Sequence, residues 1–181
     1  MRINQAYVVN LQGDTTRGRI LNLQGIGTPR NLEFMNEQTK EVITLKPDEI
    51  RSFADNEGRL YLSAHVSVDY SPVETNSLLE TPEPELKPET IFLEVLRVGK
   101  IDLYKTVLRS GRFLFYAQKE YDTIIPLVDY YYISRAKESD IAEFQRDNKI
   151  HAVKYLGQLS FMMADYPELQ NEIHSVKYTQ K

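Results

Sequence analysis

Hydrophobic and polar residues alternate with a period of two along much of the chain, as expected for half-buried β-strands. The clearest run lies in residues 60–69. One face of that strand would carry Leu60, Leu62, Ala64, Val66 and Val68. The other face would carry Tyr61, Ser63, His65, Ser67 and Asp69. We therefore expect the aliphatic set to face the core and the other set to face solvent.

Other short runs rich in β-branched and aromatic residues lie between turn-forming residues and predict further strands. Glycines are concentrated at or before Gly111, and only Gly157 follows it. The expected strands are residues 6–11, 17–23, 31–35, 42–45, 51–55, 59–70, 91–98, 101–108, 112–118 and 123–134. Short turns between them indicate antiparallel neighbours. The pattern predicts a barrel or a sandwich of about nine or ten strands.

Residues 71–90 interrupt this pattern with four of the eight prolines and with five glutamates against one lysine. Proline removes a backbone donor and fixes φ, so we expect neither a helix nor a central strand here. The segment would be a long, mobile loop outside the packed core. It would be either a plain surface loop or a functional element, with Leu78 and Leu79 available to anchor it.

The last third of the chain changes to helical spacing. A helix is expected to begin near Glu138, with a capping box at Asp140 and Glu143. An apolar stripe would follow and dock on the β domain: Ile150, Val153, Leu156, Leu159 and Met163. The capping signal at residues 165–168 predicts a second helix to about Ile173. The expected fold class is α+β, mostly β, with a β domain at residues 1–135 and a helical segment at residues 136–181.

Composition excludes several classes of protein. The 181 residues are 41% hydrophobic, which is typical of a globular chain, and the net charge is −4, so we expect no nucleic-acid partner. Cysteine is absent, which removes disulfides and thiolate chemistry. No apolar run approaches the roughly 18–20 residues of a membrane helix, so no transmembrane segment is expected. The first residues do not form a signal peptide, so any leader would be missing from this chain.

Motifs that carry chemistry are also missing. The three histidines, His65, His151 and His174, have no partners at the spacing of metal ligands. Neither a nucleophile elbow nor a phosphate-binding loop is present. We therefore expect no catalytic residues, no metal site and no cofactor. Two carboxylates could support glycan hydrolysis, but their separation cannot be deduced from the sequence.

Aromatic residues supply the candidate binding site, because the chain has twelve tyrosines, seven phenylalanines and no tryptophan. Tyr130 and Tyr132 would share one face of a strand and Tyr131 would take the other. Together with Tyr116 on a preceding strand, they are the candidate ligand- or partner-binding residues. Tyrosine offers contact area and a hydroxyl group at low entropic cost. The alternative is sheet packing with the hydroxyl groups at the surface.

Several short motifs are similar to those of a family. They are LQGDTTRGRI at residues 11–20, PDEI at 47–50, IFLEVL at 91–96 with Gly99 and Lys100, and ADYPEL at 164–169. Together they resemble a group of exported proteins of Bacteroidetes bacteria that have no assigned activity. The resemblance implies a periplasmic or cell-surface location, with the cytoplasm as the alternative. Tyr166 stands where that family often has cysteine, so no thiol role transfers.

These observations favour a non-enzymatic exported domain that binds a protein, a glycan or an envelope component. The first alternative is a carrier that encloses a small apolar ligand in a β-barrel. The second is a glycan hydrolase that uses two carboxylates. The oligomeric state is left open.

Overall fold

The computed structural model describes residues 6–23, 27–120, 122–134 and 148–178. The chain folds into two compact units. The first comprises Met1–Ser67 and Pro88–Pro126, and the second comprises Val68–Lys87 and Leu127–Lys181. The expected boundary near residue 135, and the helix start expected near Glu138 with its capping box at Asp140 and Glu143, lie outside the described residues.

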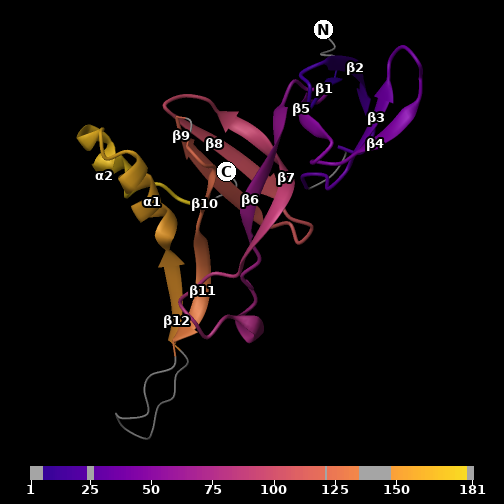
Figure 1. The fold of residues 1–181 in the computed structure, drawn as a ribbon. Helices are drawn as coiled ribbons and strands as arrows, with labels where there is room; N and C mark the ends of the chain where they lie inside the picture. The colour runs from indigo at the N-terminus through magenta and orange to yellow at the C-terminus, as the bar shows by residue number, and fades with distance from the viewer. Residues whose placement is uncertain (1–5, 24–26, 121, 135–147, 179–181) are drawn as a thin grey trace, which may run out of the picture. The chain divides into compact units, whose positions relative to one another are not determined.

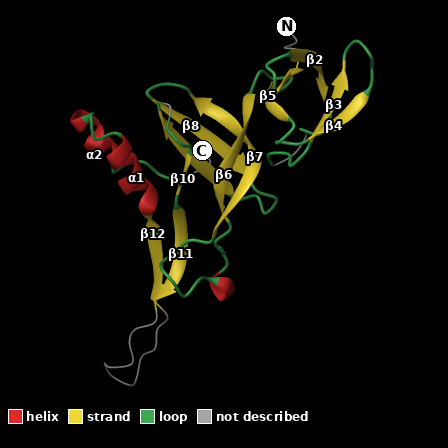
Figure 2. Cartoon of the chain, viewed as in Figure 1, coloured by secondary structure: helices red, strands yellow, loops and turns green. Residues whose placement is uncertain are grey.

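Ten strands form one sheet, in the order β10-β9-β8-β7-β6-β5-β1-β2-β3-β4 (Figures 1 and 2). Its strands are β1 (Ala6–Asn10), β2 (Thr15–Ile20), β3 (Leu32–Asn36), β4 (Val42–Leu45), β5 (Ile50–Ala54), β6 (Leu60–Asp69), β7 (Leu86–Arg97), β8 (Ile101–Val107), β9 (Phe113–Lys119) and β10 (Ile125–Leu127). The sheet ends at β10 and β4 and is not closed into a barrel, so the sandwich is the expected architecture that fits. The expected mostly β fold with two short C-terminal helices is confirmed.

The second unit contains a two-stranded antiparallel ribbon, formed by β11 (Asp129–Ser134) and β12 (Asn148–Val153). The helices α1 (Lys154–Met162) and α2 (Gln170–Ile173) follow the ribbon. Two single 3₁₀ turns complete the unit, η1 (Thr75–Ser77) and η2 (Pro167–Leu169). The second predicted helix is confirmed, because η2 and α2 together end at Ile173.

The apolar stripe predicted as one helix is wrong in its first part. Ile150 and Val153 belong to strand β12, and α1 begins only at Lys154. Pairing with β11 decides this conformation, because a β-branched run beside a Tyr-rich strand gains cross-strand contacts that override helical spacing. Within α1 the buried residues are Tyr155 and Met162, so the buried face is also displaced from the predicted one.

The prediction that residues 71–90 lie outside the packed core is wrong for Ser71 and Leu78, which are buried, whereas the other side chains of the segment are exposed or half-buried. Leu78 is buried, and Leu79 forms an isolated parallel bridge with Tyr132 of β11. Strand β7 begins at Leu86 and therefore includes Pro88. A proline close to the start of a strand costs few ladder hydrogen bonds, which is why this strand tolerates it.

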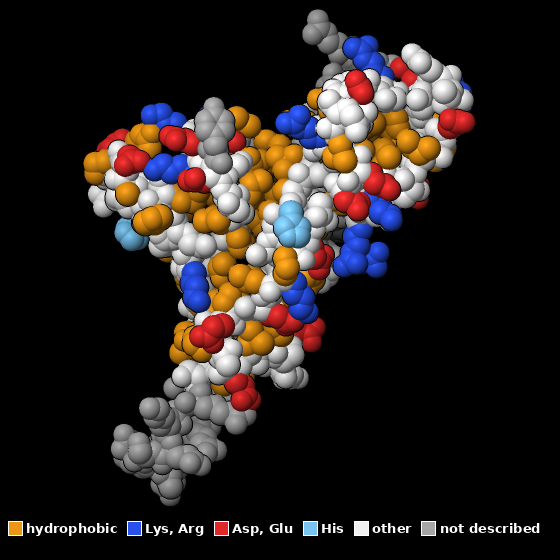
Figure 3. Space-filling model, viewed as in Figure 1, with side chains coloured by type: hydrophobic (Ala, Val, Ile, Leu, Met, Phe, Trp, Pro, Cys, Tyr) orange, Lys and Arg blue, Asp and Glu red, His pale blue; other side chains and the backbone are white. Residues whose placement is uncertain are grey.

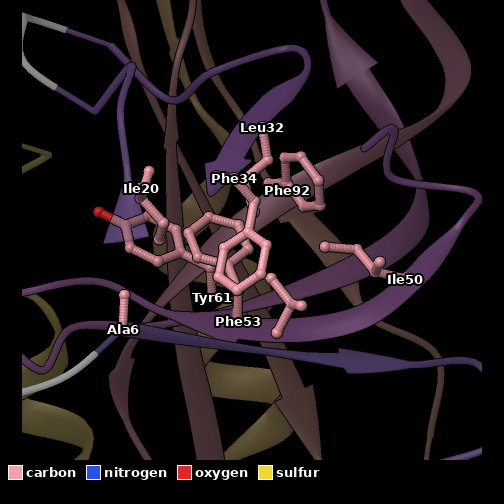
Figure 4. Packing of buried hydrophobic residues seen from close by; sticks show 9 residues of the cluster. Ala6, Ile20, Leu32, Phe34, Ile50, Phe53, Tyr61 and Phe92 are labelled. Atoms are coloured by element: carbon pink, nitrogen blue, oxygen red, sulfur yellow. The ribbon is translucent and has the colours of Figure 1, made fainter. Parts of the chain in front are cut away.

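The largest group of buried side chains in the first unit comes from β1, β2, β3, β5, β6 and β7. Its members are Ala6, Val8, Ile20, Leu32, Phe34, Ile50, Phe53, Tyr61 and Phe92. Figure 4 shows the labelled side chains packed against one another. The rings of Phe53 and Tyr61 stack with centroids 4.5 Å apart, and Phe92 meets Phe53 edge-on at 5.0 Å. These offset and perpendicular contacts are the favoured geometries for aromatic pairs.

Strand β6 does not keep the aliphatic face predicted from the sequence buried along its whole length. Tyr61 is only 3% exposed and Leu60 is 38% exposed, the reverse of the prediction, whereas Val66 and Val68 are buried as predicted. The strand therefore buries one face near its start and the opposite face near its end. Asp69, expected in solvent, is also buried, and its Oδ1 accepts the Ser71 N–H at 2.8 Å. A single alternating pattern does not reveal such a change of buried face along one strand.

Strands β2 and β3 approach each other closely at Gly18. A Cβ atom at this position would lie 2.1 Å from the backbone oxygen of Met35 and 2.5 Å from Cζ of Phe34. The first atom belongs to the paired strand β3, so a change of rotamer cannot relieve the clash. Only glycine fits while β2 keeps its register with β3.

We predict that Gly18→Ala lowers the free energy of unfolding by about 3 kcal/mol or more, because the added methyl group overpacks the β2–β3 pair. Urea unfolding followed by circular dichroism measures this. Gly157→Ala is the matched control, because nothing outside the adjacent residues and the backbone of its own helix lies within 4 Å of its Cβ position. In helix α1 the control should raise stability by about 0.5–1 kcal/mol. Equal stability of the Gly18 variant and the native chain would contradict the packing described here.

We predict that Tyr61→Ala costs about 3–5 kcal/mol, because it removes the ring stacked on Phe53 and leaves a cavity. Leu60→Ala should cost less, about 1 kcal/mol, because that side chain is 38% exposed and lies outside the buried aromatic group. Urea midpoints of the two variants test the assignment of faces. If Leu60→Ala lowers the free energy of unfolding more than Tyr61→Ala does, Leu60 faces the core as the simple alternation predicts.

Candidate functional site

The ribbon of β11 and β12 brings together three of the four candidate tyrosines. Its register pairs Tyr130 with Ala152, Tyr131 with His151 and Tyr132 with Ile150. Because side chains alternate along a strand, Tyr131 projects from one face of the ribbon and Tyr130 and Tyr132 project from the other. This division of the three tyrosines is the one expected from the sequence.

Tyr130 is an anchor inside the second unit. Its side chain is buried, and its hydroxyl group donates a hydrogen bond to the backbone oxygen of Pro82. Lys154 Nζ donates to the same oxygen at 3.1 Å and lies 5.4 Å from the centroid of the Tyr130 ring. The hydroxyl and the ammonium group therefore tie the Pro-rich segment to the ribbon. Tyr130 has little surface left for an external ligand.

Tyr132 shares this inner face. Its ring is tilted against Tyr130 with centroids 6.1 Å apart, and the chain beside it is bridged to Leu79. The N–H of the next residue, Ile133, donates to the backbone oxygen of Leu79 at 2.7 Å. Tyr132 is half-buried, so it mainly supports the packing of the Pro-rich segment.

Tyr116 does not belong to this cluster. It lies on β9 in the first unit, opposite Tyr104 of β8, and is fully buried. A buried ring offers no contact surface, so Tyr116 serves the packing of the sheet. For Tyr116 and Tyr130, the alternative of sheet packing describes the observed role, although their hydroxyl groups do not reach the surface as that alternative assumed.

Tyr131 occupies the outer face of the ribbon between two basic side chains. Its ring stacks on the imidazole of His151, with centroids 4.2 Å apart and planes 14° apart. Lys149 Nζ lies 4.3 Å from the centroid of the same ring. An ammonium group at this distance from an aromatic face is attracted by the ring quadrupole. Tyr131 is therefore held in place while it stays partly exposed.

Asp129 completes the outer face. Its Oδ1 atom lies 2.6 Å from Nε2 of His151, and the side chains are 17% and 41% exposed respectively. The contact orients the imidazole on the tyrosine ring and places a negative charge on one side of the stack. The outer face thus presents, in order along the ribbon, a carboxylate, a stacked imidazole and phenol, and an ammonium group.

This arrangement resembles part of a catalytic triad without the nucleophile. A histidine oriented by a carboxylate becomes a general base when a hydroxyl or thiol group lies within hydrogen-bond reach. Among the described residues, no hydroxyl group is hydrogen-bonded to His151. The same part of the chain contains no group of three or more His, Asp or Glu residues that could hold a metal ion. The geometry favours contact with a ligand over chemical attack on one.

Three members of this site were not predicted from the sequence: Asp129, Lys149 and His151. The helix expected across residues 150–153 would have placed His151 away from Tyr131. A signal was nevertheless available, because Lys149, Ile150, His151 and Ala152 alternate polar and apolar residues. That alternation predicts a strand with the two basic side chains on one face.

The chain matches no protein-family model, no curated protein and no solved structure. In the described part of the chain, no helix has the length and apolar character needed to cross a bilayer. On the face drawn in Figure 3, the Lys and Arg side chains are interspersed with Asp and Glu side chains.

We predict that Tyr130→Phe frees the segment that contains Pro82. The variant loses one buried hydrogen bond of about 1 kcal/mol, which corresponds to roughly fivefold more of the open state. A Glu-specific protease should then cut after Glu80 roughly fivefold faster, while cleavage after Glu57 in the first unit serves as the control. Unchanged cleavage after Glu80 would mean that the tyrosine hydroxyl does not hold the segment.

Proposed function

We propose that this protein is a non-enzymatic binding domain whose contact surface is the outer face of the β11–β12 ribbon. The observation that carries the proposal is the ring of Tyr131, which is partly exposed yet held between His151 and Lys149. A tyrosine that is already ordered loses little conformational entropy when a ligand covers it. Such residues, together with adjacent charges, dominate binding energy in many interfaces.

The proposed ligand is a protein, a glycan or an envelope component. The resemblance to exported Bacteroidetes proteins supports a periplasmic or cell-surface location for this role. The carrier alternative depends on a closed barrel, and a sheet that ends at β10 and β4 gives it less support. The hydrolase alternative depends on two facing carboxylates, whereas the outer face of the ribbon has one, Asp129, and that carboxylate is engaged with His151.

The proposal predicts that Tyr131→Ser weakens binding by roughly tenfold or more, as loss of a central aromatic contact does in other interfaces. The probes are a displayed library of extended peptides and a panel of soluble bacterial polysaccharides. His151→Ala should weaken binding of the same selected ligand, because it removes the support of the Tyr131 ring. Affinities are measured by calorimetry on folded variants.

Tyr7→Ser is the matched control, because Tyr7 is another partly exposed tyrosine on a strand and lies in the other unit. Its affinity for the ligand should equal that of the native chain. Ligands that bind equally well to the Tyr131 variant would contradict the proposed surface. Turnover of any polysaccharide in the panel would contradict the non-enzymatic role.

A further inference from the structure

Strand β12 has one open edge. It is paired with β11 alone in the two-stranded sheet. In the described chain, the backbone groups of Lys149, His151 and Val153 have no hydrogen-bond partner beyond that sheet. A two-stranded ribbon is marginally stable by itself, and an open edge is a template for a further strand.

The hydrogen-bond pattern of β11 identifies which groups face the open edge of β12. Ile133 donates its N–H to Leu79 O, on the side away from β12, and it is paired with Lys149. The pair Ile133–Lys149 is therefore a non-hydrogen-bonded pair of the antiparallel ladder. Such pairs alternate with hydrogen-bonded ones, so Lys149, His151 and Val153 all direct their N–H and C=O groups away from β11. The closer approach of chains at such pairs also suits the tight stacking of Tyr131 and His151.

The side chains beside that edge define the chemistry of a partner. Lys149 and His151 lie on the outer face, and no described carboxylate forms an ion pair with Lys149. Ile150 and Ala152 lie on the inner face and are apolar. In an added strand, a residue opposite Lys149 or His151 would share their face, and the residue after it would lie on the face of Ile150.

We propose that β12 accepts an extended peptide as a third strand, and that this peptide alternates acidic and apolar residues. This inference rests on the proposed function, because the carboxylates of the peptide would lie on the outer face, beside the Lys149 and His151 side chains that flank the Tyr131 ring. Backbone hydrogen bonds to Lys149, His151 and Val153 provide affinity, as in other cases of strand addition. Carboxylates facing Lys149 provide the selectivity.

The charge pattern favours a peptide over a second copy of this chain. Two β12 strands related by a two-fold axis pair residues of the same face, so Lys149 would meet Lys149, His151 or Val153 of the copy. None of these side chains carries a carboxylate. An extended partner with acidic residues at alternate positions would pair with the free backbone groups of β12 and would also place carboxylates beside Lys149.

The test uses three synthetic peptides with blocked ends, VEVEVEV, VKVKVKV and VVEEEVV, with the full-length chain at neutral pH and low salt. We expect VEVEVEV to bind at least roughly tenfold more tightly than the other two. Lys149→Glu should reverse the preference between VEVEVEV and VKVKVKV. Lys177→Glu makes the same charge change elsewhere in the second unit and should leave the preference unchanged.

Amide hydrogen exchange provides the second measurement. Saturating VEVEVEV should slow exchange at Lys149, His151 and Val153, with little change at Ile150 and Ala152, whose N–H groups already face β11. Protection of the wrong alternate set, or of none, would overturn strand addition even if a ligand binds. If these amides become protected without peptide as the protein concentration rises, a second copy of the chain occupies the edge. That result would overturn the proposal of a peptide partner.

Failure of this inference and failure of the proposed function are distinguishable. If VEVEVEV does not bind but other ligands are lost in Tyr131→Ser, the outer face binds ligands and β12 is not the docking edge. In that case the charge of Lys149 serves to prevent edge-to-edge pairing of β12 with other strands. If the Tyr131 substitution affects no ligand, the contact surface itself is wrong.

Discussion

The antiparallel register of β11 and β12 is the constraint on which the candidate site depends. Side chains alternate between the faces of a strand, so a slip of one residue would move His151 to the inner face and leave Tyr131 without its imidazole. The register is held from both faces. On the inner face, the buried Tyr130 is bonded to Pro82 O, and on the outer face His151 is bonded to Asp129. The buried Tyr130 thus helps to position the side chains that the ribbon exposes on its other face.

The first unit is organised differently, because several of its strands are packed on both faces. Phe92 and Leu93 are consecutive and both fully buried, although they point to opposite sides of β7. Phe92 joins the aromatic group around Phe53 and Tyr61, and Leu93 packs on the other side. Strand β9, next to the end strand β10, buries the consecutive residues Tyr116 and Ala117 in the same way. Strand β4, at the other end of the sheet, exposes Val42 and Ile43.

Much of this fold follows from local pattern. Turn residues and period-two runs located strands β1 to β9, most within a few residues of their ends, because β-branched residues and glycine turns act locally. The single strand expected at residues 123–134 is two strands of different sheets, β10 and β11. The same local evidence failed where partners distant in sequence decide the outcome. Tyr61 is buried because Phe53 and Phe92 meet it, and residues 150–153 are extended because β11 lies beside them. For the candidate site, the sequence identified Tyr131 and the split of the three tyrosines. It could not supply His151, Lys149 and Asp129, because their proximity depends on a register set by tertiary pairing.

The close approach at Gly18 has a consequence for how this sequence can change over generations. Substitution of Phe34 by a smaller residue would remove one of the two clashes. The clash with Met35 O would remain, because that oxygen belongs to the backbone. No compensating substitution elsewhere can therefore admit a side chain at position 18 while the two strands stay paired. Diverged descendants of this chain should vary freely at Val42 or Leu60 and retain glycine here, so position 18 would mark the family more durably than any of its tyrosines.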